Sequence, residues 1–219
     1  MGSVKRGYHA PLRREQAAAT KRRIIEAAVA EFTEHGWASA TVAAIAERAG
    51  VTSQAVYLAV GPKPRLLIHA VETAVAGDSH DIPLANRPAF ADVYATGVSA
   101  HRRLQAFAHA SADIYSRAAP LFMALQDAAR ADDATRSLAD SAGERRMTDH
   151  RRLARLLLPQ AAAGEVATLS QTIWVLAGPA VYIDLVHRWG WTPERYAAWL
   201  SSLLHDAVKN IQQQRRARS

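Results

Sequence analysis

The sequence has no cysteine among its 219 residues, which excludes disulfide bonds, thiolate metal sites and thiol catalysis together. The alternating apolar and polar pattern of half-buried strands is also nearly missing. The most apolar run, 172–185, is too short to span a bilayer and contains Gly178, Pro179 and Asp184. The basic N terminus is not followed by the apolar segment of a signal peptide. These absences predict an all-helical, soluble, cytoplasmic protein that does not contact membranes.

Catalytic and metal-binding motifs are missing too. We find no glycine-rich phosphate loop, nucleophile elbow or His-Glu-x-x-His pattern. The nine histidines include no His-x3-His pair, and His101 and His109 are eight residues apart. We therefore predict no enzymatic activity, no cofactor and no metal site. A helical enzyme is the competing interpretation, and turnover of a bound ligand would favour it.

The positive charge is concentrated near the two ends of the chain. Residues 1–65 hold ten Lys and Arg against five Asp and Glu, a net charge of +5. Residues 66–219 hold seventeen against fifteen, and the tail residues Arg215, Arg216 and Arg218 exceed that excess. A basic N-terminal region suits the binding of phosphates. A solvated basic surface is the alternative.

The segment 41–63, TVAAIAERAGVTSQAVYLAVGPK, predicts two short helices joined by a tight turn. Four apolar residues lie at i, i+3, i+4 and i+7 and give the first helix one apolar face: Val42, Ile45, Ala46 and Ala49. Thr41 and Thr52 stand at the two N-cap positions. Gly50 follows the first helix, where a left-handed conformation excludes most side chains. This pattern is typical of a helix-turn-helix that places its second helix in the DNA major groove.

Helical periodicity continues through most of the chain. Residues 1–14 are interpreted as a basic flexible arm, of which Met-Gly-Ser resembles an expression tag and the basic residues could enter a minor groove. A helix over 15–35 ends at Gly36, and a helix starting near Pro62 extends to about Gly77. The segment 77–88 is a linker. Further helices are predicted at about 89–95, 98–117, 119–130, 136–158, 163–189 and 193–212. The predicted domains are 15–76, the helix-turn-helix domain, and 77–214, a larger helical domain.

The N-terminal pattern resembles the TetR family of dimeric transcriptional regulators over about residues 20–70. The residues that match in type and spacing are Ile24, Ile25, Ala27, Ala28, Phe32, Gly36, Thr41, Ile45, Ala46, Ala49, Gly50, Val51, Tyr57, Lys63, Leu66 and Leu67. The segments RPAFADV and RWGWTPERYAAWL are similar to a subgroup of that family. The chain departs from the family where Ala59 and Val60 replace an aromatic pair, and where Ser53 replaces a frequent Lys or Arg.

The candidate DNA-binding residues are Thr41, Thr52, Ser53, Gln54, Tyr57, Leu58 and Lys63. Val56 and Val60 are expected to face the core, which leaves the polar side of the second helix exposed. The Gln54 amide can donate and accept together against an adenine. The resemblance implies that Tyr57 and Lys63 contact the DNA backbone. The alternatives are a packing role for Tyr57, a capping role for Thr41 and a solvated Gln54.

The C-terminal domain has two broadly apolar helices near its end. By resemblance to the family, these pair with their counterparts in a homodimer. The candidate interface residues are Ile173, Leu176, Ala180, Ile183, Tyr196, Leu200, Leu203 and Ala207. Packing inside one chain is the alternative for the same residues.

The middle helices carry aromatic and polar residues that could line a ligand cavity. The candidates are Phe107, Tyr115, Phe122, Met123, Gln126, His150, Trp174 and Tyr182. Ordinary core packing is the alternative for each. The leading hypothesis is a homodimeric TetR-like repressor that binds a palindromic double-stranded DNA operator and is released by a small-molecule effector. A ligand-binding or interaction module without specific DNA recognition is the competing hypothesis.

Overall fold

A computed structural model describes residues 9–77 and 87–218 of the chain. Every regular element in those residues is helical, which confirms the predicted fold class. Residues 1–8 of the predicted arm, including Lys5 and Arg6, and residues 78–86 of the predicted linker lie outside the described part. The chain divides into two compact units, one holding 1–74 and 120–139 and the other 75–119 and 140–219. The segment 120–139 is thus grouped with the N-terminal helices, whereas the sequence placed it in the second domain.

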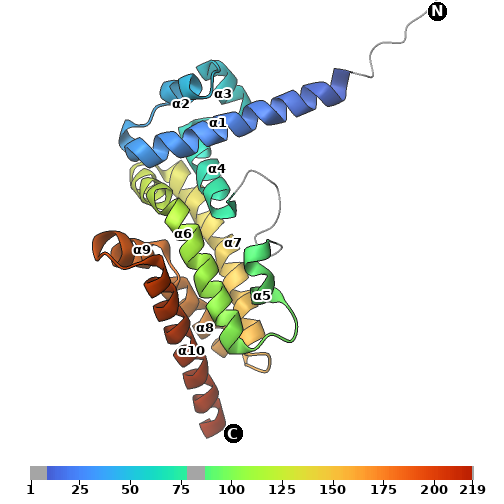
Figure 1. Ribbon diagram of the computed structural model, residues 1–219, viewed down its shortest axis with the longest axis vertical. Coiled ribbons are helices and arrows are strands. Elements are labelled where there is room, and N and C mark those ends of the chain that lie inside the picture. The colour runs from blue at the N-terminus through green and yellow to red at the C-terminus, as the bar shows by residue number, and fades with distance from the viewer. Residues whose placement is uncertain (1–8, 78–86, 219) are drawn as a thin grey trace, which may run out of the picture. The chain divides into compact units, whose positions relative to one another are not determined.

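The first unit begins with a long helix, α1 (His9–Ser39). It starts six residues before the predicted position, so residues 9–14 are helical instead of forming an arm. Gly36 interrupts α1 at the predicted end, with a φ of 66° that most side chains avoid. Ile24, Ile25 and Phe32 are buried along one side of the helix. Figure 1 shows α2 (Val42–Arg48) and α3 (Ser53–Ala59) on one side of α1, with α4 (Lys63–Ala76) following them.

The first unit also takes parts of two long helices, α6 (Ala100–Ala131) and α7 (Asp133–Leu157). The sequence predicted a break near Pro120, but α6 continues through that residue. A proline inside a helix costs one backbone hydrogen bond and some steric strain. Ala118, Ala119 and Leu121 are each fully buried, and packing on this scale outweighs the loss. The prediction of two helices at this position was wrong for that reason.

The second unit contains the N-terminal part of α6, the C-terminal part of α7 and the remaining helices. These are η2 (Pro88–Phe90), α5 (Ala91–Tyr94), α8 (Ala163–Leu176), α9 (Pro179–Tyr182), the π-helical turn η3 (Ile183–Arg188) and α10 (Pro193–Arg218). The buried guanidinium of Arg103 donates to the carbonyls of Val93 and Ala95 and so satisfies the end of α5. Helices α8 and α10 pack against each other, as Figure 1 shows.

The segment Ala163–Arg188 is the one stretch of the described chain that is long and apolar enough to cross a membrane by length and composition. Core helices of soluble proteins pass the same test. The stretch is not one continuous α-helix, because Ala177 leaves helical geometry and α9 starts anew at Pro179. Of its most apolar 18-residue window, 39% is buried inside the protein. The segment therefore combines a buried core face with an exposed apolar face.

Candidate nucleic-acid interface

Two threonine caps and one glycine turn set the path of α2 and α3. The hydroxyl of Thr41 accepts a hydrogen bond from the Ala44 amide at 3.0 Å, and that of Thr52 accepts from Ala55 at 3.2 Å. Each bond satisfies an amide that the first helical turn leaves without a partner. Between the helices, Gly50 has a φ of 65°. This conformation turns the chain between Arg48, where α2 ends, and Ser53, where α3 begins.

Helix α3 has one buried side and one exposed side. Val56 and Val60 are buried, as predicted, and hold the helix against the unit. The exposed side carries Gln54, with Tyr57 at 53% exposure and Leu58 at 82%. Thr52 is also exposed and Ser53 is half-buried. A large, almost fully exposed leucine beside a glutamine and a tyrosine is a surface suited to contact with another molecule.

A pair of ions fixes α2 on α1. The guanidinium of Arg48 donates to both carboxylate oxygens of Glu34, at 2.9 and 2.6 Å, and lies 3.6 Å from the buried carboxylate of Glu31. The hydrogen bond from Arg48 lowers the pKa of Glu34 and, reciprocally, raises that of Arg48. The bidentate geometry orients α2 relative to α1 and thereby positions the turn into α3.

Lys63 makes a contact that sequence analysis did not find. Its Nζ donates to the carbonyl of Trp37 at 2.5 Å and lies 4.3 Å from the centre of the Trp37 ring. The ring itself stacks on Phe32, with centroids 6.2 Å apart. Partial burial lowers the pKa of Lys63. The ammonium has two further donors beyond the one used by Trp37, so a phosphate contact is compatible with this position.

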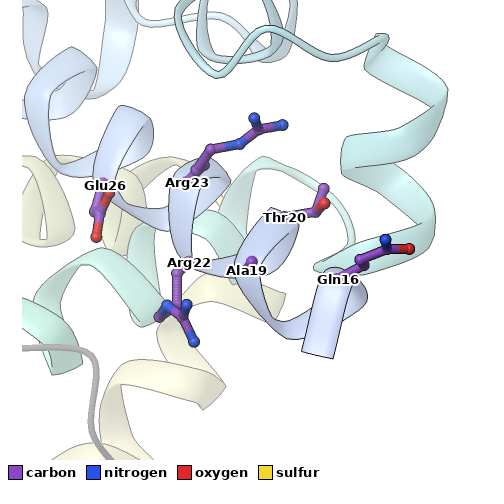
Figure 2. A pocket seen from close by; sticks show the side chains of 6 residues that line it. All are labelled: Gln16, Ala19, Thr20, Arg22, Arg23 and Glu26. Carbon is purple, nitrogen blue, oxygen red and sulfur yellow. The ribbon is translucent and has the colours of Figure 1, made fainter. Parts of the chain in front are cut away.

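The N-terminal half of α1 is exposed on nearly all sides and rich in arginine. A surface pocket there is lined by Gln16, Ala19, Thr20, Arg22, Arg23 and Glu26. Figure 2 shows that Arg22 and Arg23 point to opposite sides of the helix. A small-ligand site requires polar groups that converge on one point, and the polar groups of this pocket do not. Arg23 also borders a second hollow with Arg48 and Ala49, next to the end of α2. This neighbourhood adds positive charge beside the helix-turn-helix.

The predicted ligand-lining residues fall into two groups. Phe122, Met123 and Gln126 lie in the segment that groups with the first unit, and Met123 is 49% exposed. The other five lie in the second unit and form two sets of neighbouring rings, one of Phe107, His150 and Trp174 and one of Tyr115 and Tyr182. Arg146 connects the two sets, because it lies over the Trp174 ring and interacts with Tyr115. Arg146 was missing from the predicted set. The signal that could have found it is its place one helical turn before His150.

The predicted dimer residues also fall into two groups. Ile173, Tyr196 and Leu200 are fully buried within the chain's own core. We therefore correct their assignment, because they have no surface left to offer a partner. The remaining five keep some exposed surface: Leu176, Ala180, Ile183, Leu203 and Ala207. Val175, which sequence analysis omitted, is 61% exposed on α8.

The arrangement of α1 to α3, with a capped and exposed second helix after a glycine turn, defines a helix-turn-helix protein. Residues 24–59 match the model of the family described as bacterial regulatory proteins, tetR family. The sequence of this region is therefore similar to the N-terminal domain of that family, as the sequence resemblance predicted. The chain has no significant match among curated protein sequences.

Solved structures of regulators share the fold over most of the chain. A protein described as a transcriptional regulator of Pseudomonas aeruginosa PAO1 has a TM-score of 0.65 at 19% identity, covering 87% of this chain and 93% of its own. A TetR-like transcriptional regulator of Rhodococcus sp. RHA1 has a TM-score of 0.58 at 18% identity, covering 88% and 97%. The fatty acid degradation regulator FadR of Bacillus halodurans has a TM-score of 0.62 at 16% identity, covering 84% and 93%. At these identities the likeness establishes the fold.

Proposed function

We propose that the protein is a cytoplasmic TetR-like transcriptional repressor that binds a palindromic DNA operator as a homodimer. The exposed row on α3 carries this proposal. Gln54, Tyr57 and Leu58 face outward, while Val56 and Val60 anchor the helix from behind. A helix presented in this way fits the major groove, where side chains reach the edges of the bases. The basic residues of α1 supply charge for the flanking phosphates.

Selection of bound duplexes from a random DNA library tests the proposal directly. We expect an enriched sequence with two-fold symmetry. Gln54→Ala should relax the preference at one base pair in each half-site, at a cost of about 1–3 kcal/mol. Gln213→Ala near the end of α10, where the side chain is also exposed, is the matched control and should leave the profile intact. An unchanged profile for Gln54→Ala would reject base reading by this residue.

A salt-dependent but sequence-independent affinity would support the competing function, an interaction module without specific DNA recognition. Repression is tested by placing the selected sequence across a promoter that drives a reporter gene. Lower expression with the protein present supports a repressor, and higher expression contradicts it.

Dimerisation should use the exposed apolar faces of α8 and α10. Val175 and Leu203 are exposed there, beside the buried residues that join the two helices within one chain. A two-fold dimer would bury this surface and bring two copies of α3 to the two half-sites. Val175→Arg should weaken self-association by about tenfold or more, measured by analytical ultracentrifugation. Leu156→Arg, at a 40% exposed position on α7, is the control. Equal effects of both variants would place the interface elsewhere.

Release by a small molecule requires that the effector bind one arrangement of the protein more tightly than another. Helix α4 follows the helix-turn-helix and ends at the predicted linker, so we propose that it transmits the change to the DNA-binding unit. Operator affinity measured with and without effector tests this step. If a ligand binds but leaves operator affinity unchanged, the proposal of effector control is contradicted, whereas the proposal of DNA binding still holds.

A further inference from the structure

An arginine lies among aromatic rings in the second unit. Arg146 and His150 are one turn apart on α7, and the Arg146 guanidinium carbon is 3.8 Å from the centre of the Trp174 ring on α8. The His150 ring meets Phe107 and Trp174 edge to face, with centroids 6.0 and 6.1 Å apart. Gly143 makes room for this arrangement, because a Cβ there would come within 3.2 Å of the Trp174 ring.

Three tyrosines extend the same cluster, which we call the Arg146 cluster. The Tyr115 hydroxyl donates to the Ala177 carbonyl at 2.6 Å. The Tyr182 ring lies 5.5 Å from that of Tyr115 and 4.9 Å from that of Tyr196. Burial raises the pKa of Tyr115 and of Tyr196, while the positive charge of Arg146 acts on both in the opposite direction. The phenols therefore stay protonated and can donate hydrogen bonds.

Three buried polar atoms of this cluster have no hydrogen-bond partner: Arg146 Nε, His150 Nδ1 and the Tyr196 hydroxyl. His150 is 5% exposed and Tyr196 is fully buried. Leaving such a group unsatisfied typically costs about 1–3 kcal/mol. Three of them around one set of rings indicate that a polar group completes the cluster when it is bound.

The charge of the cluster indicates which polar group this is. In the part of the chain that the structure describes, Arg146 has no carboxylate partner. Burial, followed by the nearby Arg146 charge, lowers the pKa of His150 to about 3, so His150 is neutral at physiological pH. A guanidinium without a counterion, next to a phenolic O–H, matches an anion that accepts hydrogen bonds. The surrounding rings match an apolar, planar body.

We propose that the Arg146 cluster is the effector site and takes a small aryl carboxylate, whose carboxylate meets Arg146 and Tyr196. This rests on the proposed function for its regulatory meaning. The ring of Trp174 covers the guanidinium and is only half-buried. It is therefore the side chain that must move when the ligand enters. Its movement gives a fluorescence signal, and Trp174→Phe assigns that signal among the five tryptophans.

Calorimetry with the full-length protein tests the site without DNA. The probes are phenylacetate, 3-phenylpropionate and indole-3-acetate, each paired with its neutral primary amide. We expect at least one acid to bind about tenfold or more tightly than its amide, because hydrogen bonds to charged groups are the stronger ones. Equal binding of acid and amide, or no binding by any of the acids, would overturn the proposal.

Two variants identify the atoms involved. Arg146→Gln should weaken binding of the acid by about tenfold or more. Arg151→Gln, at an exposed position on the same helix, should leave binding of the acid unchanged. Tyr196→Phe removes an unpartnered hydroxyl, so the midpoint of thermal unfolding should stay equal or rise. The same variant should bind the acid more weakly. If the Tyr196→Phe protein binds the acid with wild-type affinity, the Tyr196 hydroxyl does not contact the ligand. If the two arginine variants weaken binding equally, the Arg146 cluster is not the binding site.

Operator affinity with and without the bound acid then tests regulation. The acid should lower operator affinity by about tenfold or more. An acid that binds the cluster but leaves operator affinity unchanged would overturn the effector assignment. If the protein selects no operator at all, the proposed function fails, and calorimetry still decides whether the cluster binds carboxylates.

Discussion

Replacing Leu58 by alanine separates DNA binding from folding more cleanly than any other change on α3. The side chain is 82% exposed, so the folded protein gains little from it. Full burial of a leucine is worth about 1.5–3 kcal/mol, and the small buried share of Leu58 therefore contributes about 0.3–0.5 kcal/mol. Alanine also has a slightly better helix propensity, which offsets part of that loss.

On DNA the balance reverses. If Leu58 meets a thymine methyl group or a sugar, its remaining surface is buried in the complex. That burial is worth about 1–2 kcal/mol, or a factor of about 5 to 30 in affinity for the selected operator. The prediction for Leu58→Ala is therefore a clear loss of operator binding in a protein of nearly wild-type stability.

Fluorescence anisotropy with the selected duplex measures the affinity, and urea unfolding measures the stability. Val56→Ala is the matched comparison, because Val56 is fully buried on the opposite side of the same helix. That variant should lose about 1–3 kcal/mol of stability. The reasoning would be refuted if Leu58→Ala bound the operator as tightly as the wild type, or if it were destabilised as much as Val56→Ala.

Two further predictions concern buried or partly buried charges. His150 has its pKa lowered from 6.5 to about 3, so below pH 6.5 the unfolded chain binds a proton that the folded chain excludes until about pH 3. The free energy of unfolding should therefore decrease as the pH is lowered, by about 2 kcal/mol between pH 7.5 and pH 5. His150→Phe should show a smaller fall over the same pH range in urea unfolding, and an equal fall would contradict the assignment. Lys63→Met keeps the apolar stem against Trp37 but removes the charge. This variant should weaken binding to every DNA sequence and reduce the slope of log affinity against log salt concentration by about 1. Lys209→Met, at an exposed position, is the control and should leave the slope unchanged. An unchanged slope for Lys63→Met would show that Lys63 contacts Trp37 and no phosphate.

The local signals of the helix-turn-helix were sufficient to predict its structure. Thr41, Thr52 and Gly50 act through hydrogen bonds and backbone angles that span only three or four residues. The burial of Val56 and Val60 follows from helical periodicity for the same reason. These interactions depend on nearby residues, so the sequence contains almost all of the information that determines them.

Contacts between distant residues were not predictable in the same way. The position of Lys63 depends on the carbonyl of Trp37, which is 26 residues away. Pro120 remains inside α6 because of the burial of its neighbours, and its own helix-breaking chemistry suggested the opposite. Sequence analysis did not single out Arg146, because its partners Tyr115, Trp174 and Tyr196 come from three other helices. In each case tertiary packing decides what local propensity cannot.

The last two long helices show why an apolar stripe does not identify its partner. Helices α8 and α10 pack against each other inside the chain, and each also carries an apolar residue outward, Val175 on α8 and Leu203 on α10. Ile173 and Val175 are two residues apart, and about 200° of helical rotation places them on opposite faces. One is fully buried and the other is 61% exposed. The sequence pattern placed Ile173 in the interface and omitted Val175, whereas the exposed area assigns Ile173 to the core and leaves Val175 exposed for the proposed contact with a second copy of the chain.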